Sequence, residues 1–433
     1  MEVSALSVWL HDRRVTCGMQ VRPAEWPALS EWGFDDSGIL RHASGGFFSL
    51  ASVNRQGSTD HTQPIILQPE IGILGFAFRR NVTGTELLLQ AKSEPGNVGL
   101  TQIAPTVQAT LSNYRQRHGG KATPLLAHFE DPQHAITNIA QSEQGTRFLG
   151  KYNRNVLVQV ANDLEAPDPR YRWSFAADVF ALVDCDFSMN TDARSVLVCS
   201  DWAHLVADTP FADSAQSNQF ARALRDSYQS DGACDEAVRK LGRCRAVRTH
   251  AVTIAGMRQA TEWVRTDQGF ADQSKQHFDV VLVDVEARDR EVSRWQQPLL
   301  ANCTASTVVL CCQMRRNELQ FFLRISDEIG FRERCQWGPS ANSQVDSPSH
   351  PLLDPGFWSQ GHVHAEVRQS DEGGRFFQSV VRYVLIEMPF DTELPLNDES
   401  CWVTLGQIKK MLRRSGHTNN ELRSVLSLAM RWI

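Results

Sequence analysis

An internal repeat constrains this 433-residue chain more than any other feature of its sequence. Gln63-Pro64 recurs as Gln297-Pro298, 234 residues later. The run Q-S-E-Q-G-T-R-F at 141–148 recurs as Q-S-D-E-G-G-R-F at 369–376, and N-T-D-A-R-S-V-L at 190–197 recurs as N-N-E-L-R-S-V-L at 419–426. Because the blocks keep their order and nearly their spacing, the sequence predicts that one structural unit is duplicated.

The expected units are residues 1–205 and 240–433, joined by a polar linker at 206–239 with a helix near 220–228. Apolar residues at helical spacing predict helices at 175–183 and 402–412. Without βαβ alternation or a G-x-G-x-x-G run, the pattern favours an α+β fold of mixed sheets with helices. Runs rich in β-branched and aromatic residues predict strands at 47–53, 71–79, 85–91, 155–160, 278–285, 306–313, 319–325 and 383–387.

The composition excludes several classes of protein. A net charge of −6 gives no electrostatic footprint for nucleic acid. No apolar run reaches the roughly 18–20 residues that span a membrane, and the first residues do not resemble a secretory signal. The ten cysteines are scattered without a C-x-x-C pair, which predicts buried thiols, no metal site and a cytoplasmic protein.

The densest polar run is Q-A-K-S-E-P-G-N at 90–97, directly after an apolar strand. Residues two apart on a strand share a face, so Lys92 and Glu94 are expected to point to the same place. Gln108 and Tyr114 follow in the next polar stretch. A surface salt pair before a turn is the simpler alternative, but the many amides and hydroxyls nearby favour a ligand site.

A second polar block, at 141–155, contains Arg147, Lys151 and Arg154. The planar fork of arginine suits a diphosphate, although a solvated basic face would have the same composition. The carboxylate and amide side chains of this block suit recognition of a ligand's hydroxyl groups. A third block, N-T-D-A-R at 190–194, is equally compatible with a functional site and with a capped turn.

In these blocks the sequence resembles the NDP-hexose 2,3-dehydratase family of deoxysugar biosynthesis. The resemblance implies a Nudix-like α+β fold in each of two tandem repeats, the second of them diverged, a homodimer and no cofactor. It also implies an NDP-4-keto-6-deoxyhexose substrate, such as dTDP-4-keto-6-deoxy-glucose. The matching stretches are G-G-F-F-S-L at 45–50, Q-P-I-I-L-Q-P-E-I-G-I-L-G at 63–75, Q-A-K-S-E-P-G-N at 90–97, A-P-T-V-Q-A-T-L-S-N-Y at 104–114, K-Y-N-R-N at 151–155, R-E-V-S-R-W-Q-Q-P-L at 290–299 and C-W-V-T-L-G-Q-I at 401–408, besides the repeated blocks above.

The implied reaction removes the 2-hydroxyl after a base takes the hydrogen from carbon 3, and a downstream 3-ketoreductase would use the diketone. Glu94 and Glu143 are the candidate base and acid, in either order. Lys92 is the candidate enolate stabiliser and Tyr114 a further proton donor. The candidate substrate-binding residues are Gln63, Gln68, Gln90, Asn97, Gln108, Gln141, Arg147, Lys151, Asn153 and Arg154.

The second copy has lost part of this set. Lys92 aligns with Ser326, Asn153 with Val381, and Gln108 with Asn342. The sequence therefore predicts one competent site, in the first copy, while the second copy is structural or binds a nucleotide without turning it over. Two alternatives remain. A Nudix hydrolase would need a glutamate-rich metal-binding helix, which the sequence lacks, and the other alternative is a non-catalytic sugar-nucleotide-binding or pathway-scaffold protein.

Overall fold

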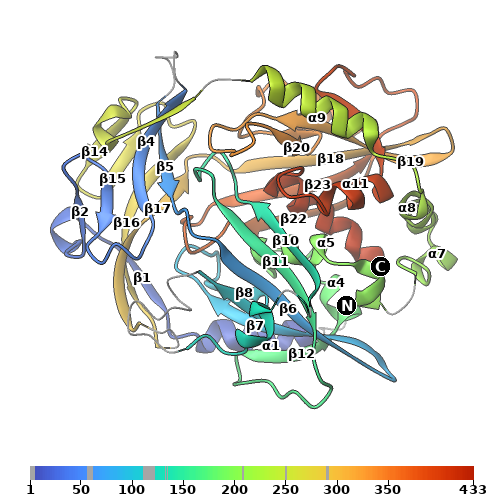
Figure 1. The fold of residues 1–433 in the computed structure, drawn as a ribbon, viewed down its shortest axis with the longest axis horizontal. Helices are drawn as coiled ribbons and strands as arrows, with labels where there is room; N and C mark the ends of the chain where they lie inside the picture. The colour runs from blue at the N-terminus through green and yellow to red at the C-terminus, as the bar shows by residue number, and fades with distance from the viewer. Residues whose placement is uncertain are drawn as a thin grey trace.

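The computed structural model describes residues 5–55, 62–110, 122–131, 133, 135–206, 209–248, 251–288 and 292–433. These residues form two sheets of seven strands and two of five, with helices packed around and between the larger sheets. The small sheets lie on the left in Figure 1 and the large sheets on the right. The chain therefore has the α+β class expected from the sequence.

The two large sheets have the same strand order. The N-terminal large sheet contains β6 (Gly72–Asn81), β7 (Gly84–Ser93), β8 (Thr101–Ala104), β9 (Val107–Ala109), β10 (Ala135–Ser142), β11 (Tyr152–Gln159) and β12 (Tyr171–Phe175). The C-terminal large sheet contains β18 (Ser306–Arg315), β19 (Glu318–Ser326), β20 (Gln336–Gly338), β21 (Ala341–Asn342), β22 (His362–Ser370), β23 (Val380–Glu387) and β24 (Ser400–Thr404). The order β10-β11-β6-β7-β12 matches β22-β23-β18-β19-β24. In each sheet a single pair, β11–β6 or β23–β18, is parallel.

The two small sheets exchange a strand between the halves of the sequence. One sheet contains β1 (Gln20–Pro23), β14 (Trp263–Thr266), β15 (Gly269–Asp272), β16 (Phe278–Glu286) and β17 (Arg294–Asn302). The other contains β2 (Trp32–Phe34), β3 (Leu40–His42), β4 (Ser49–Arg55), β5 (Gln63–Leu67) and β13 (Val252–Ala255). Strand β1 pairs with β16, with Val21 opposite Val285, and β13 pairs with β4, with Ile254 opposite Val53. Each half of the sequence thus completes a sheet of the other half.

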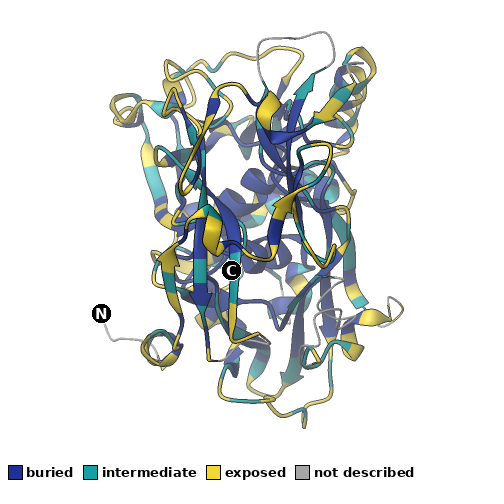
Figure 2. Ribbon diagram, turned by 90° about the vertical axis from the view of Figure 1, so that its left-hand side faces the viewer, coloured by how far each residue is buried: buried dark blue, intermediate teal, exposed yellow. Residues whose placement is uncertain are grey.

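The helices join the large sheets through one shared core. Helix α5 packs on the N-terminal large sheet, α12 packs on the C-terminal one, and the two helices contact each other. One apolar cluster includes residues of both large sheets and both helices, and buried segments fill the interior in Figure 2. The helices are α1 (Ala5–Thr16), α3 (Ala127–Glu130), α4 (Ala176–Phe180), α5 (Thr191–Cys199), α6 (Trp202–Val206), α7 (Ser214–Ser217), α8 (Gln219–Gln229), α9 (Asp235–Val247), α10 (Pro355–Trp358), α11 (Leu405–Leu412) and α12 (Asn420–Leu426), with 3₁₀ turns η1 (Trp26–Ala28), η3 (Met257–Gln259), η4 (Pro351–Leu353) and η5 (Ser427–Trp432).

All eight strands expected from the sequence are present, but the two expected helices begin too early. Trp402 lies in β24 and Phe175 in β12, so α11 and α4 begin after them. The start of α11 is fixed by Thr404, whose side chain accepts a hydrogen bond from the backbone of Gln407, which bonds back in a capping box. Helix α8 covers the range in the linker for which a helix is expected.

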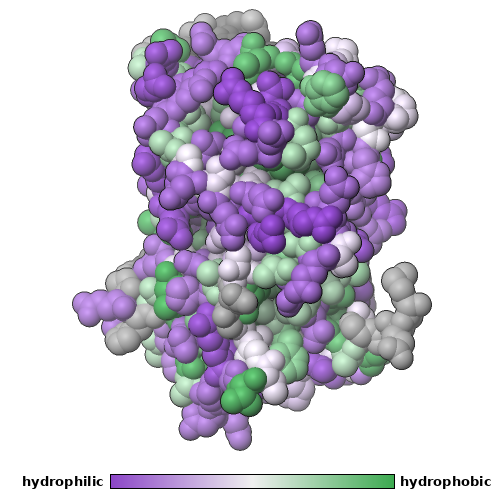
Figure 3. Space-filling model, turned by 90° about the vertical axis from the view of Figure 1, so that its right-hand side faces the viewer, coloured by the Kyte–Doolittle hydropathy of each residue, from purple (hydrophilic) through white to green (hydrophobic). Residues whose placement is uncertain are grey.

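No helix in the described ranges is long and apolar enough to cross a membrane. Hydrophilic side chains cover most of the face in Figure 3, with apolar residues between them in small groups.

Candidate active site

Lys92 and Glu94 lie together where β7 ends, as their spacing predicts. The Lys92 ammonium is 3.3 Å from Glu94 Oε1, and Gln108 Nε2 donates to the same oxygen at 3.0 Å. The Asn97 amide reaches the other carboxylate oxygen at 3.5 Å. Glu94 is only 4% exposed. The Glu94 carboxylate therefore has one cation and two amide donors around it in a buried position.

Helix α5 joins this network through its first turn. The Asn190 side chain caps the helix by accepting from the Ala193 amide at 2.9 Å, and its Nδ2 donates to Gln108 Oε1, also at 2.9 Å. The block at 190–194 is therefore the buried, capped start of a helix. Because the cap residue also holds Gln108, the position of α5 and that of Glu94 are coupled.

Glu143 follows β10 and is held from a different strand. Asn153 on β11 donates to Glu143 Oε1 at 2.7 Å, and Asn153 Oδ1 accepts from the Gly72 backbone at 3.0 Å, which fixes the amide orientation. Lys151 donates to the backbone carbonyl of Glu70. Burial lowers the pKa of Lys151, while the charges of Glu143 and Glu70 oppose this shift.

Asp192 and Glu372 connect these groups into one cluster. Burial raises the pKa of Asp192 well above its usual range, and Glu372, Glu143 and Glu94 raise it further. Burial raises the pKa of Glu372 to about 7, with Glu143 and Glu94 adding to the shift and Arg375 opposing it. We call Lys92, Glu94, Glu143, Asp192 and Glu372 the N-terminal cluster. Burial and the neighbouring negative charges therefore favour the protonated forms of Asp192 and Glu372.

A related cluster lies in the C-terminal half. Glu328 accepts hydrogen bonds from Ser326 Oγ at 2.8 Å and from Asn419 Nδ2 at 3.2 Å. Burial lowers the pKa of Arg147 to about 10, against the opposing charges of Asp371, Glu328 and Glu421. We call Glu328, Asp371, Glu421 and Arg147 the C-terminal cluster. It has Ser326 where the N-terminal cluster has the ammonium of Lys92.

The structure places some of the expected binding residues at the N-terminal cluster and others elsewhere. Asn97, Gln108, Lys151 and Asn153 lie in or beside it through the contacts above. Gln68 adjoins it, because Gln68 Oε1 accepts from Arg375 at 3.0 and 3.1 Å. Three amides have different partners: Gln63 donates to the Thr146 carbonyl, Gln90 to the Tyr171 hydroxyl and Gln141 to the Leu412 carbonyl.

Arg147 and Arg154 do not join the N-terminal cluster. Arg147 belongs to the C-terminal cluster, where its guanidinium also covers the ring of Phe278. Arg154 donates to Asn138 Oδ1 at 3.0 Å, and it points away from Asn153 because neighbouring residues of a strand face opposite sides of the sheet. Tyr114 lies outside the described residues.

Asp192 comes from the block at 190–194, which the sequence leaves open between a site and a capped turn. Glu372 and Arg375 are not among the site residues that the sequence predicts. Both come from the repeated block at 369–376, whose likeness to 141–148 was the available signal. That likeness equates Glu372 with Gln144 and Arg375 with Arg147, but it does not tell which cluster each residue faces. Each of the two blocks reaches into the other half of the molecule, so Arg375 lies by the N-terminal cluster and Arg147 by the C-terminal cluster.

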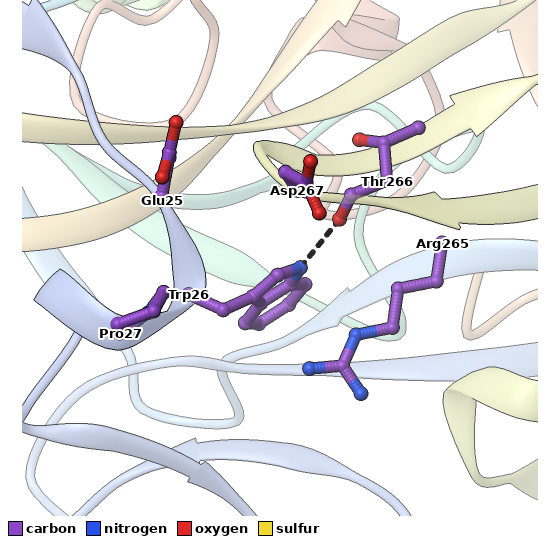
Figure 4. A pocket seen from close by; sticks show the side chains of 6 residues that line it. All are labelled: Glu25, Trp26, Pro27, Arg265, Thr266 and Asp267. Carbon is purple, nitrogen blue, oxygen red and sulfur yellow. Dashed lines mark hydrogen bonds between the residues drawn. The ribbon is translucent and has the colours of Figure 1, made fainter.

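A surface pocket of about 470 Å³ lies between η1 and the β14–β15 hairpin. In Figure 4 the Trp26 indole donates to the Thr266 carbonyl, at 2.7 Å. The guanidinium of Arg265 covers the Trp26 ring at 4.5 Å. None of the residues expected at a site lines this pocket.

This chain is similar to known proteins over nearly its whole length. The family model described as NDP-hexose 2,3-dehydratase matches residues 3–200 and 235–429. A dTDP-4-dehydro-6-deoxy-alpha-D-glucopyranose 2,3-dehydratase of Saccharopolyspora spinosa is 32% identical, over 98% of this chain and 90% of that protein. Proteins of the same name from Amycolatopsis orientalis and Streptomyces violaceoruber are 27% and 28% identical, over 99% and 98% of this chain and 90% and 96% of their own lengths. The chain belongs to the NDP-hexose 2,3-dehydratase family and is a hydro-lyase.

Proposed function

We propose that the enzyme removes the 2-hydroxyl of an NDP-4-keto-6-deoxyhexose, such as dTDP-4-keto-6-deoxy-glucose, and forms the 3,4-diketo-2,6-dideoxy sugar nucleotide. The observation that carries this proposal is the gathering of Lys92, Glu94 and Glu143 with two further carboxyls. The reaction needs a base for the hydrogen on carbon 3, a cation for the enolate oxygen and an acid for the departing hydroxyl.

Within this cluster Glu94 and Glu143 are the candidates for the carboxylate base. Lys92 would stabilise negative charge on the 4-keto oxygen as the enolate forms, because an ammonium in a mostly buried site is poorly screened by water. Asn97, Gln108 and Asn153 would bind sugar hydroxyls, while Lys151 and Arg375 are better placed for the diphosphate than Arg147 and Arg154. This assignment follows the contacts of the described residues.

We extend the proposal to the fold of the two halves. Each half would be a Nudix-like unit of a tandem repeat, supported by the matching strand orders and by the two separate segments that the family model matches. The first unit would be the competent one, because the C-terminal cluster has Ser326 in place of a lysine. The resemblance also supports a cytoplasmic homodimer whose product passes to a 3-ketoreductase, and light scattering coupled to size-exclusion chromatography would test the dimer.

The direct test incubates the protein with dTDP-4-keto-6-deoxy-glucose and a 3-ketoreductase that traps the diketone. We expect Lys92→Met to lower kcat roughly 10²–10³-fold, since a charge-stabilising group is removed. Lys275→Met is the matched control, because Lys275 is an exposed lysine paired with Asp279. Trapped product from wild type but unchanged rates in both Glu94→Gln and Glu143→Gln would overturn the base assignment. Tight binding without any product would favour a binding or scaffold protein.

A further inference from the structure

The loop that carries Glu372 is fixed against the N-terminal cluster. The Gly96 amide donates to the Gly373 carbonyl at 2.8 Å, and the Gln378 amide donates to the Gly96 carbonyl at 2.7 Å. A Cβ atom at Gly96 would lie only 1.5 Å from the Phe376 carbonyl oxygen, so the turn after Glu94 packs directly on this loop. The position of Glu372 is therefore set by backbone contacts with residues close to Glu94.

Glu372 and Glu94 face the same point. A Cβ atom at Gly374 would lie 3.5 Å from Glu372 Oε1 and 3.8 Å from Glu94 Oε1. The C-terminal half therefore delivers a carboxyl to the cluster that the N-terminal half builds. At the equivalent position the N-terminal half has Gln144, which donates to Asp371 Oδ1 at 2.9 Å and carries no ionisable proton.

Glu372 differs from Glu94 and Glu143 in its partners. Glu94 has a lysine and two amides, and Glu143 has the Asn153 amide. In the part of the chain that the structure describes, no side chain donates a hydrogen bond to the Glu372 carboxyl, and Glu372 remains partly exposed. Asp192 also receives no side-chain hydrogen bond within the described residues, but it is only 4% exposed, so the partly exposed Glu372 is the more accessible proton donor. The Glu372 pKa of about 7 suits proton transfer near neutral pH.

We propose that Glu372, supplied by the C-terminal half, is the general acid that protonates the departing 2-hydroxyl in the N-terminal cluster. This inference rests on the proposed dehydration. The carboxylate base takes the proton from carbon 3, and the C–H electron pair forms the enolate of the 4-ketone. The enolate then forms the bond between carbons 2 and 3 as the C2–O bond breaks, and the hydroxyl leaves as water with the proton of Glu372.

The proton balance closes when the enol becomes a ketone. The protonated base returns its proton to carbon 2, and the enol hydroxyl on carbon 3 gives its proton back to Glu372. The net change is loss of one water, and both carboxyls return to their starting states. These roles suit the cluster, because Lys92, Gln108 and Asn97 contact the Glu94 carboxylate, whereas burial raises the pKa of Glu372.

The test uses Glu372→Gln in the full-length protein with dTDP-4-keto-6-deoxy-glucose in D₂O. Trapping with the 3-ketoreductase measures dehydration, and NMR measures exchange of the hydrogen on carbon 3. We expect dehydration to fall roughly 10²–10⁴-fold with little change in KM, while exchange at carbon 3 continues. Glu94→Gln or Glu143→Gln, whichever removes the base, should stop exchange as well.

The controls separate a chemical role from a structural one. Glu366→Gln, in the same half, removes an exposed carboxyl paired with Arg382 and should change neither rate. Glu372→Asp should restore part of the dehydration if the group is an acid. The proposal would be overturned if Glu372→Gln dehydrated the substrate at the wild-type rate. It would also be overturned if Glu372→Gln lost both dehydration and exchange at carbon 3 while unfolding at the same temperature as wild type. If wild type neither dehydrates nor exchanges this substrate, the proposed function itself fails.

Discussion

At the scale of single residues, the N-terminal cluster places chemically similar carboxyl groups in different surroundings. Glu94 is surrounded by donors, whereas Glu372 is mostly buried beside other carboxyls and has its pKa raised to about 7. A carboxyl whose pKa is raised in this way can act as an acid near neutral pH beside another carboxylate that acts as the base.

This difference predicts a pH dependence. A carboxyl with a raised pKa is protonated below that value and loses its proton above it, so kcat/KM for dehydration should fall as the pH rises above about 7. Steady-state rates between pH 5 and 9, with stability checked at each pH, would measure this decrease in kcat/KM with rising pH. In Glu372→Gln the residual rate should no longer show this decrease. A wild-type profile that stays flat to pH 9 would contradict the assignment.

The sequence predicts part of this site and misses part of it for a physical reason. Lys92 and Glu94 are correctly placed together, because alternation along a strand is a local property. The partner of Arg147 depends on the direction in which its loop crosses between the halves, and that direction is set by tertiary packing such as the contact of Gly330 with the Phe148 carbonyl. The repeat identifies Arg375 as the equivalent of Arg147, but it does not predict which cluster either arginine contacts.

At the scale of elements, α5 and α12 begin in the same way but meet different clusters. Asn190 caps α5 and holds Gln108, while Asn419 caps α12 by accepting from Leu422 at 2.9 Å and donates to Glu328. The sequence shows both Asn residues, but a cap and a turn have the same composition, so it does not predict that the whole of α5 is buried.

We expect Asn190→Ala and Asn419→Ala to destabilise the protein similarly, by about 1–2 kcal/mol each, because each removes a helix cap. Only Asn190→Ala should also lower dehydration, since it frees the amide that holds Glu94. Urea unfolding and trapped-product rates would separate the two effects. Equal losses of activity in both variants, at matched stability, would show that the C-terminal cluster also takes part in turnover.

At the scale of the whole molecule, the exchanged strands make the two halves parts of one body. Strand β1 completes a sheet of the C-terminal half and β13 one of the N-terminal half. Helix α8 packs on β19, where the Ser227 hydroxyl donates to the Leu319 carbonyl at 2.6 Å. The sequence predicts α8 but neither β1 nor β13, and its pattern contains no information about which half each of these elements joins.

This arrangement predicts that the covalent link between the halves is dispensable once the protein has folded. A specific protease site inserted in the exposed segment between Asp231 and Ala233 should allow cleavage into two fragments that elute together in size-exclusion chromatography. The shared core and exchanged strands would hold the fragments together, because separating them exposes large apolar areas and breaks two strand pairings. The cleaved protein should keep the dehydration rate of the uncut protein, since Glu372 and Arg375 still reach the N-terminal cluster. Separation of the fragments in native buffer, or loss of activity while they remain together, would show that the two halves do not complete the site in the way these contacts indicate.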